Sequence, residues 1–342
     1  MPLTRLRATT TALLLATPLA LAGCGSDSGS DADATSGGDG AFPVSIKSSL
    51  GTAEITEKPE KVVTLGQGST ETSIALGTIP VGMEEYAWAA DKSGYTPWVN
   101  EAVKDEGGEL PEFVGAGEEL DMEKIVELEP DVILAPWSGI TQEQYDSLSE
   151  IAPTVAYPDQ AWSIDWDEQI EIIGQALGQE DDAAKLVTDL EKQLADEAKK
   201  HPDWKNYTFS YVYTTPDTLG VFKPTEQRAD MVRKLGLKSD PAVDKMKETE
   251  GTDSAVIGYE NADKLNDSDL IFTFYSDPKA KKQAMSNKLY ASIPAIKAGA
   301  VVSSDDNSFV TASSMINPLT VPYALETYPE MIDAAIAKAD TK

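Results

Sequence analysis

The chain has 342 residues, of which 41% are hydrophobic and 25% charged, and this composition excludes general disorder. It carries 58 acidic and 28 basic side chains, and the resulting formal charge of -30 argues against nucleic acid and anionic lipid surfaces as partners. A single cysteine and a single histidine exclude an internal disulfide and a histidine-rich zinc site. The length predicts two domains or one large domain of two lobes.

Residues 1–23 have the pattern of an exported lipoprotein's signal peptide. Two arginines precede an apolar run at 11–21, which is too short to span a hydrocarbon core of about 30 Å. The run ends in Leu-Ala-Gly-Cys, which resembles the lipobox of bacterial lipoproteins, whose cysteine receives a diacylglycerol and becomes the mature N-terminus. We therefore expect lipidation of Cys24 and anchoring on the outer face of the cytoplasmic membrane. A chance cysteine after an ordinary signal is the alternative.

Residues 24–41 are predicted to be a flexible tether between this anchor and the folded part. They are rich in glycine, serine and aspartate, and no apolar side chain larger than alanine occurs before Phe42. Such a segment cannot form a packed core and spans on the order of 20 Å.

Residues 42–178 are predicted to form an N-terminal lobe in which strands alternate with helices. The runs expected to be strands are 61–65, 79–83, 131–135 and 154–157, and those expected to be helices are 71–76, 122–128, 142–151 and 168–177. This alternation is typical of a mainly parallel sheet with helices on both faces.

Residues 179–201 are predicted to form one long helix that joins two lobes. The segment 181–200 begins with acids, ends with two lysines and contains no glycine or proline, so a rigid rod of about 30 Å is expected.

Residues 202–342 are predicted to form a C-terminal lobe of the same kind. Strands are expected at 207–214, 269–275 and 300–303, and helices at 229–235 and 334–338. Residues 123–134 are echoed by 260–272 with one extra residue. The fold class expected is therefore α/β, with two similar lobes, mainly parallel sheets and a ligand cleft between them.

The loop after the first strand reads Gly66-Gln67-Gly68-Ser69 and resembles the start of a dinucleotide fingerprint. The third glycine is missing, and Glu71 occupies a place where a pyrophosphate would meet negative charge. We expect no cofactor. A loop at the carboxyl end of a strand is still a natural ligand position, so Gln67 and Ser69 are candidate ligand contacts.

Aromatic side chains follow several predicted strands, where they can line a cleft for a small molecule. The candidates are Tyr86, Trp88, Trp137, Trp162 and Tyr275. Ordinary packing under loops accounts for about half of such residues. Trp166, at the start of a helix, is expected in the core instead.

The exported part has only two arginines, Arg228 and Arg233. Arg228, at a predicted helix start, can face the cleft and bind a carboxylate or hydroxamate oxygen, although a surface ion pair is an equal alternative. Arg233 is expected to be solvated. His201 is expected to be a solvated cation at the end of the long helix, and no metal site is predicted.

Three strings, at residues 61–82, 121–134 and 258–271, resemble the iron-siderophore, heme and cobalamin binding proteins of ABC importers. The resemblance covers roughly residues 42–340. It implies a bilobal binding protein that moves little when it binds a ligand in its cleft. It also implies that one acidic residue on each lobe docks onto arginine pockets of the membrane permease, and the matching positions are Glu123 and Glu260.

The strings do not identify the ligand, so we compare the charges of possible ligands with the acidic charge of the protein. A ferric catecholate carries several negative charges, which an acidic protein opposes, whereas a neutral or cationic ferric hydroxamate meets no such penalty. We therefore expect a ferric siderophore that contains hydroxamate groups. A citrate-type hydroxamate held by Arg228 stays open, and so do heme, through tyrosine ligation, and cobalamin.

Two functions of other classes also stay open. The protein could be a lipid-anchored sensor or adhesin without a transporter, or an enzyme acting on its ligand. The spacing of acidic and basic residues shows no acid–base pair, and nothing resembles Gly-x-Ser-x-Gly or His-Glu-x-x-His. The expected function is therefore that of a non-enzymatic substrate-binding component of an ABC importer.

Overall fold

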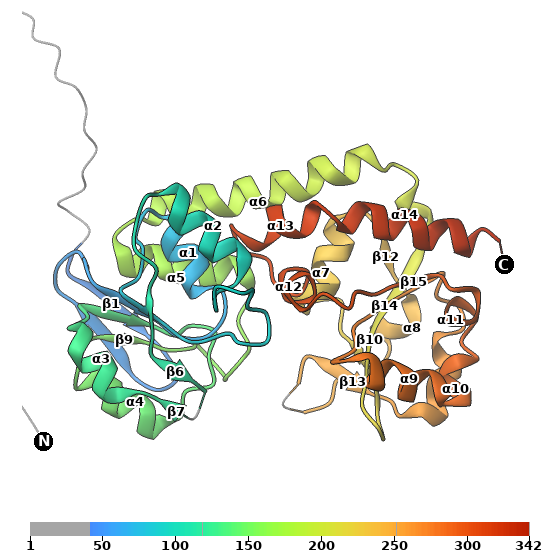
Figure 1. Cartoon of the computed structure of the whole chain (residues 1–342), viewed down its shortest axis with the longest axis horizontal. Helices are drawn as coiled ribbons and strands as arrows, with labels where there is room; N and C mark the ends of the chain where they lie inside the picture. The colour runs from blue at the N-terminus through green and yellow to red at the C-terminus, as the bar shows by residue number, and fades with distance from the viewer. Residues whose placement is uncertain (1–41, 118, 251, 342) are drawn as a thin grey trace, which may run out of the picture. The chain divides into compact units, whose positions relative to one another are not determined.

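The computed structural model describes residues 42–117, 119–250 and 252–341. Their strands form two separate main sheets, one in the first half of the chain and one in the second (Figure 1). The predicted signal peptide, Cys24 and the predicted tether lie outside the described residues. Within the described residues, no helix has the length and apolar character needed to cross a membrane.

The first half contains a five-stranded sheet in which every pairing is parallel. Its strands, in spatial order, are β5 (Glu112–Phe113), β4 (Gly82–Met83), β3 (Val62–Thr64), β8 (Val132–Leu134) and β9 (Thr154–Val155). Its helices are α1 (Ser69–Ala75), α2 (Pro97–Asp105), α3 (Met122–Leu128), α4 (Gln142–Ser149) and α5 (Trp166–Leu177). Two hairpins complete this half: β1 (Val44–Lys47) with β2 (Thr52–Ile55), and β6 (Gly115–Ala116) with β7 (Glu119–Leu120).

Both faces of this sheet are buried, which explains why its strands are apolar throughout. Side chains alternate between faces along a strand, so Val62 packs with α1 and α5 while its neighbour Val63 packs in the cluster that contains α3 and α4. The parallel α/β arrangement expected from the sequence is confirmed for this half. Helix α3 has the predicted bounds, and the predicted strand at 79–83 is reduced to its last two residues.

The second half contains a mixed sheet. Its strands, in spatial order, are β13 (Ser254–Val256), β11 (Leu219–Phe222), β10 (Thr208–Thr214), β14 (Leu270–Thr273) and β15 (Val301–Val302), with β12 (Lys238–Ser239) paired to β10. Strand β10 pairs parallel with β12 and β14, and β14 pairs parallel with β15. Strand β11 pairs antiparallel with β10 and β13. The antiparallel edge was not predicted, because β11 and β13 are short and lack an alternating pattern.

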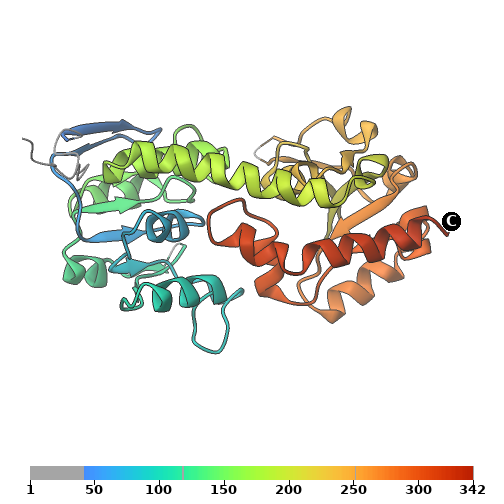
Figure 2. The ribbon, with the colours of Figure 1, turned by 90° about the horizontal axis from the view of Figure 1, so that it is seen from above.

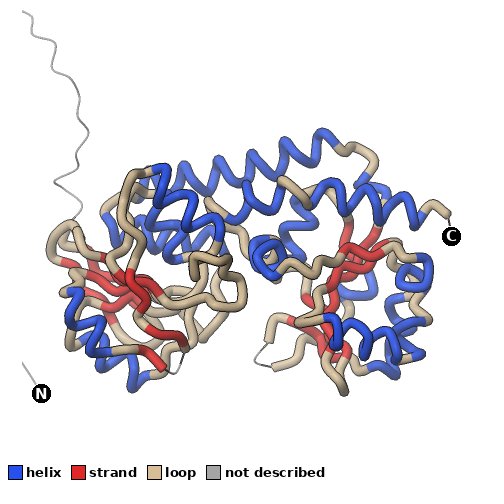
Figure 3. The backbone as a smooth tube through the Cα atoms, in the orientation of Figure 1, coloured by secondary structure: helices blue, strands red, loops and turns tan. Residues whose placement is uncertain are grey.

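The helices of the second half surround this sheet (Figure 3). They are η1 (Trp204–Asn206), α7 (Gln227–Lys234), α8 (Pro241–Asp244), η2 (Tyr259–Leu265), α9 (Pro278–Ser286), α10 (Lys288–Ala291), α11 (Pro294–Ala298), α12 (Asn307–Ala312), α13 (Thr320–Leu325) and α14 (Tyr328–Ala339). The segment that echoes α3 in sequence, η2, is a 3-10 helix with a kink at Asn261.

Helix α6 (Glu180–Lys200) links the two halves and packs against α5 of the first and α7 of the second (Figure 2). It matches the predicted helix at 181–200. Acids occupy its first turn and lysines its last, as the helix dipole favours. At its end His201 stacks on Trp204 at 4.0 Å, and the Trp204 indole donates to Asp333 of α14 at 2.7 Å.

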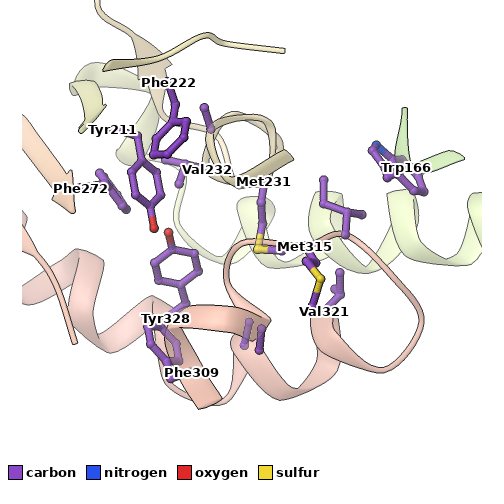
Figure 4. Close-up of a cluster of buried hydrophobic side chains, with 14 of the residues drawn as sticks. Trp166, Tyr211, Phe222, Met231, Val232, Phe272, Phe309, Met315, Val321 and Tyr328 are labelled. Atoms are coloured by element: carbon purple, nitrogen blue, oxygen red, sulfur yellow. The ribbon is translucent and has the colours of Figure 1, made fainter. Parts of the chain in front are cut away.

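A core cluster that includes residues of both halves surrounds α7 (Figure 4). Phe222 of β11, Met231 and Val232 of α7, and Met315 after α12 are all buried in it. Tyr211 and Tyr328 point their hydroxyl groups toward one another (Figure 4). This packing fixes the start of α7, on which the candidate site depends.

Candidate ligand-binding site

A cavity of about 980 Å³ is lined by residues of both halves of the chain. The first half contributes the loops that follow β3, β8 and β9 and the first turn of α5. The second half contributes the start of α7, the segment before β13 and residues 314–317. Carboxyl ends of parallel strands meet at one edge of a sheet, and this edge is where such sheets bind ligands.

Glycines allow two of these loops to lie close together. Gly66 has a φ of 73°, and a Cβ atom there would lie 1.8 Å from the backbone oxygen of Trp137. The carbonyl of Gln67 accepts a hydrogen bond of 2.6 Å from the side chain of Gln169 on α5. The loop after β3 is therefore held from two sides, and Gln67 lines the cavity as expected.

Two tryptophans form an aromatic wall of the cavity. Trp137 and Trp162 meet edge to face with their ring centroids 4.8 Å apart. Trp162 has a φ of 62°, in the left-handed region, and its amide donates to the Ser138 carbonyl at 3.1 Å. Its indole lies against Gly139, where a Cβ atom would come within 2.2 Å of the ring. The indole is thus held by backbone contacts, although it is 47% exposed.

Arg228 lines the same cavity and is engaged by Glu226. Its Nε donates to Glu226 Oε1 at 2.8 Å, and its backbone amide donates to Oε2 at 3.1 Å. The guanidinium carbon lies 4.1 Å from the centroid of the Phe222 ring, within range of a cation–π contact. Arg228 therefore lines the cavity and also forms an ion pair, which is largely enclosed and not at the surface as the alternative expected.

Acidic side chains outnumber basic ones around the cavity. Eight carboxylates line it, and the cations are Arg228, Arg233 and Lys234. Burial, followed by the charges of Asp165 and Asp159, raises the pKa of Glu168. The wall therefore carries a negative electrostatic potential.

A second, water-sized cavity of about 20 Å³ adjoins the first and shares Gln67 and Met315 with it. Tyr86 lines this small cavity and not the large one. Burial, with the charges of Glu84 and Glu71, raises the pKa of Tyr86, so its phenol stays neutral. Glu71 is itself buried and accepts a hydrogen bond of 2.8 Å from the Trp98 indole.

Besides Tyr86, three candidate contacts lie outside the large cavity, and they line neither cavity. Ser69 is fully buried at the start of α1, and Trp88 is 42% exposed outside the cavity wall. Tyr275 is buried, with its hydroxyl 3.1 Å from that of Tyr290. Trp166 is buried in the core, as expected.

The sequence analysis missed several residues of the wall. These are the acids of residues 159–168, Glu226, and residues 314–317 between α12 and α13. A signal for Glu226 was present, since it lies two positions before one of the few arginines. Residues 314–317 carry no such signal, because tertiary packing alone brings them to the cavity. Among the described residues, no group of three or more histidine, cysteine or acidic side chains could hold a metal ion.

Residues 62–307 match the family described as periplasmic binding proteins. The chain belongs to this family. This periplasmic binding protein is 27% identical over 295 residues to YfiY of Bacillus subtilis (strain 168), described as a probable siderophore-binding lipoprotein, and the match covers 83% of this chain and 86% of YfiY. The members of the family are substrate-binding proteins, and this class agrees with the one expected from the sequence.

Two solved structures share the fold. PiaA of Streptococcus pneumoniae TIGR4, solved with ferrichrome, is 32% identical with a TM-score of 0.76, covering 86% of this chain and 99% of PiaA. SirA of Staphylococcus aureus, solved with staphyloferrin B, is 28% identical with a TM-score of 0.64, covering 87% of this chain and 98% of SirA. The resemblance to iron-siderophore binding proteins and the two-lobed α/β fold are both confirmed.

Proposed function

We propose that this periplasmic binding protein captures a ferric siderophore outside the cytoplasmic membrane and delivers it to the permease of an ABC importer. The observation that carries the proposal is the cavity between the halves, with its aromatic wall and Arg228. The described residues hold no metal-binding cluster, so iron would be recognised as cargo inside its chelator. PiaA, solved with ferrichrome, and SirA, solved with staphyloferrin B, have the same fold.

Charge favours a hydroxamate-containing siderophore within this class. The relatives do not decide the point, because they include a ferric enterobactin-binding protein and an iron(3+)-hydroxamate-binding protein. The cavity wall is acidic, so a strongly anionic ferric catecholate would be repelled, whereas a neutral or cationic hydroxamate would not. The indoles of Trp137 and Trp162 suit its apolar chain.

Heme is the second candidate, and the positions of the histidine and tyrosine side chains that could ligate its iron weigh against it. His201 stacks on Trp204 at the end of α6 and does not line the cavity. Tyr86 lines the small adjoining cavity. Binding of heme therefore requires a side chain other than these to reach the iron.

Titration of the purified protein tests the ligand class. Tryptophan emission is followed while ferrioxamine B, ferrichrome, ferric staphyloferrin B, ferric enterobactin, heme and cobalamin are added. We expect a ferric hydroxamate to quench emission, and Trp162→Phe to reduce the quenching. Trp88→Phe is the matched control, because Trp88 is equally exposed but lies outside the cavity wall. A tight heme or cobalamin signal with no response to any siderophore would overturn the proposal.

Delivery requires contact with the permease, and Glu123 and Glu260 are the proposed docking residues. Both are exposed, and each precedes a central strand of its half, β8 or β14. Asp121 already caps α3 by accepting from the Lys124 amide at 2.9 Å, so Glu123 is not needed for capping. The Glu260 carboxylate lies over Gly258, which has a φ of 69°.

The lipid anchor on Cys24 is also part of the proposal. YfiY is described as a lipoprotein, and the Leu-Ala-Gly-Cys box supports the same processing here. Mass spectrometry of the native protein should find a diacylglyceryl-modified N-terminal cysteine. An unmodified thiol, or an N-terminus at another residue, would contradict it.

A further inference from the structure

Each cationic side chain of the cavity wall is already engaged by a carboxylate. Arg228 pairs with Glu226 at 2.8 Å, and Arg233 Nη1 pairs with Asp230 Oδ1 at 3.0 Å. Lys234 lies 3.7 Å from carboxylate oxygens of Asp230 and of Glu191. A ligand entering the cavity therefore meets cations whose charge is already compensated.

The pair between Glu226 and Arg228 differs from the other pairs because it is enclosed. The side chain of Glu226 is 5% exposed and that of Arg228 is 22% exposed, whereas that of Arg233 is 45% exposed. Water screens an enclosed pair poorly, so each charge cancels most of the other's field. Both oxygens of Glu226 are directed to Arg228, one to Nε and one to the backbone amide.

The rest of the wall is acidic around this neutral pair. Asp159, Asp165, Asp167 and Glu168 line the side formed by the first half, and Glu248 and Asp253 line the side formed by the second. Arg228 could offset these charges for an anionic ligand only if its own charge were uncompensated. Glu226 is the residue that compensates it.

We propose that Glu226 is a specificity-determining residue that makes the cavity select ferric complexes without net negative charge. The inference rests on the proposed function and names the substrate class of the same cavity. Arg228 then donates its remaining N–H groups to hydroxamate oxygens of a ferric complex without net negative charge, and does so as a dipolar partner, not as an unpaired cation. The surrounding carboxylates favour binding of a complex that is cationic or neutral.

Glu226→Gln tests the proposal, since glutamine keeps one oxygen that can cap α7 and removes the charge together with the acceptor that faces Arg228 Nε. The probes are ferrioxamine B, which is cationic, ferrichrome, which is neutral, and ferric staphyloferrin B, which is anionic, and they are added at a pH well above 7, where Glu226 is ionised. We expect the variant to bind the anionic complex about tenfold more tightly than the wild type and the cationic complex several-fold more weakly. Glu150→Gln, at an exposed residue after α4 and outside the wall, is the control and should leave all affinities unchanged.

The double variant Glu226→Gln, Arg228→Gln keeps the proposal testable if the single variant fails to fold, because loss of both buried charges is tolerated better than loss of one. The two glutamines of this variant carry no net charge, as the ion pair of the wild type does. We expect the ratio of affinities for cationic and anionic complexes to stay at the wild-type value, even if every affinity falls.

The outcomes are distinguishable. A selective loss of the anionic complex in the double variant would show that Arg228 acts as an uncompensated cation, and would overturn the inference. So would a wild-type preference for the anionic complex, or an unchanged preference in a folded Glu226→Gln variant. If the wild type bound none of the three probes, the proposed function itself would fail.

Discussion

Glu226 combines burial with an ion pair, and its protonation should be linked to folding. Burial raises its pKa to about 7, although Arg228 opposes the shift. The folded state then holds a proton that the unfolded state releases at lower pH, so the free energy of unfolding should fall as pH rises from about 4.5 to about 7. We expect a loss of about 3 kcal/mol over this interval that is absent in Glu226→Gln.

Urea denaturation of both proteins at several pH values measures this difference. Other titrating groups contribute equally to the two proteins, so the comparison isolates Glu226. Parallel stability curves for wild type and variant would show that Glu226 has an ordinary pKa in the folded state.

Gly139 supports the aromatic wall by leaving room for the Trp162 indole. In Gly139→Ala the new Cβ atom would overlap the ring, and the indole should move away from Trp137. We expect ligand affinity to fall about tenfold, while the half-exposed position limits the loss in unfolding free energy to about 1 kcal/mol. In a Trp162→Ala background the same change should have almost no further effect on affinity, and equal losses in both backgrounds would contradict the assigned contact.

The candidate site shows what the sequence can predict at this scale. Loops after parallel strands mark one edge of the sheet, and this rule predicted that Gln67, Trp137 and Trp162 would lie near a ligand; all three line the cavity. The same rule does not give side-chain direction. Tyr275 follows β14 closely, yet its phenol packs toward Tyr290, because packing with distant residues decides which way a side chain turns.

Among the elements, α6 should tolerate change on one face only. Leu190 is buried in the core, whereas Lys192 on the same helix is exposed. We expect Leu190→Ala to lower the unfolding free energy by about 2–5 kcal/mol through the cavity that it creates. Lys192→Ala is the control and should cost less than about 0.5 kcal/mol, since an exposed ion pair contributes little.

Chemical denaturation measures both variants. A small effect of Leu190→Ala would show that α6 packs loosely against its neighbours, and the helix could then not fix the distance between the halves.

Elements with strong local signals were predictable, and elements without them were not. Helices α3 and α6 have apolar spacing and acids in their first turns, and both were predicted within one residue. Strand β11 is a short apolar run of four residues, which periodicity cannot assign. The kink in η2 at Asn261 is not revealed by local helix propensity.

At the scale of the whole molecule, docking should require one acid from each half. In the double variant Glu123→Ala, Glu260→Ala, we expect normal siderophore affinity and uptake of iron by cells reduced about tenfold or more, because charge-assisted contacts to the permease are lost. Glu127→Ala, Asp263→Ala is the matched control, since both are exposed acids on the same two elements.

Normal uptake in the first double variant at normal expression would reject docking through these residues. Loss of siderophore affinity in that variant would instead place them at the ligand site. Equal loss of uptake in both double variants would indicate a general effect of surface charge.

The two-lobed organisation was predictable because both sheets leave the same repeating pattern of apolar runs and amphipathic segments in the sequence. A cleft between the two halves was expected from the two-lobed pattern and the aromatic loops, but the residues of the second half that line it were mostly not. Residues 225–228 and 314–317 reach it from separate parts of the second half, and their meeting depends on contacts such as the hydrogen bond from the Ile316 amide to the Gln227 side chain at 3.0 Å.

The left-handed backbone of Trp162 means that selection for stability and selection for ligand binding favour different residues at this position. A tryptophan in this conformation costs on the order of 1 kcal/mol of folding stability, whereas glycine or asparagine would adopt it with less strain. A mutant library screened for heat resistance alone should therefore enrich glycine or asparagine at position 162. Screening the same library for capture of its ligand should restore tryptophan, since the strained residue is kept for recognition and not for folding.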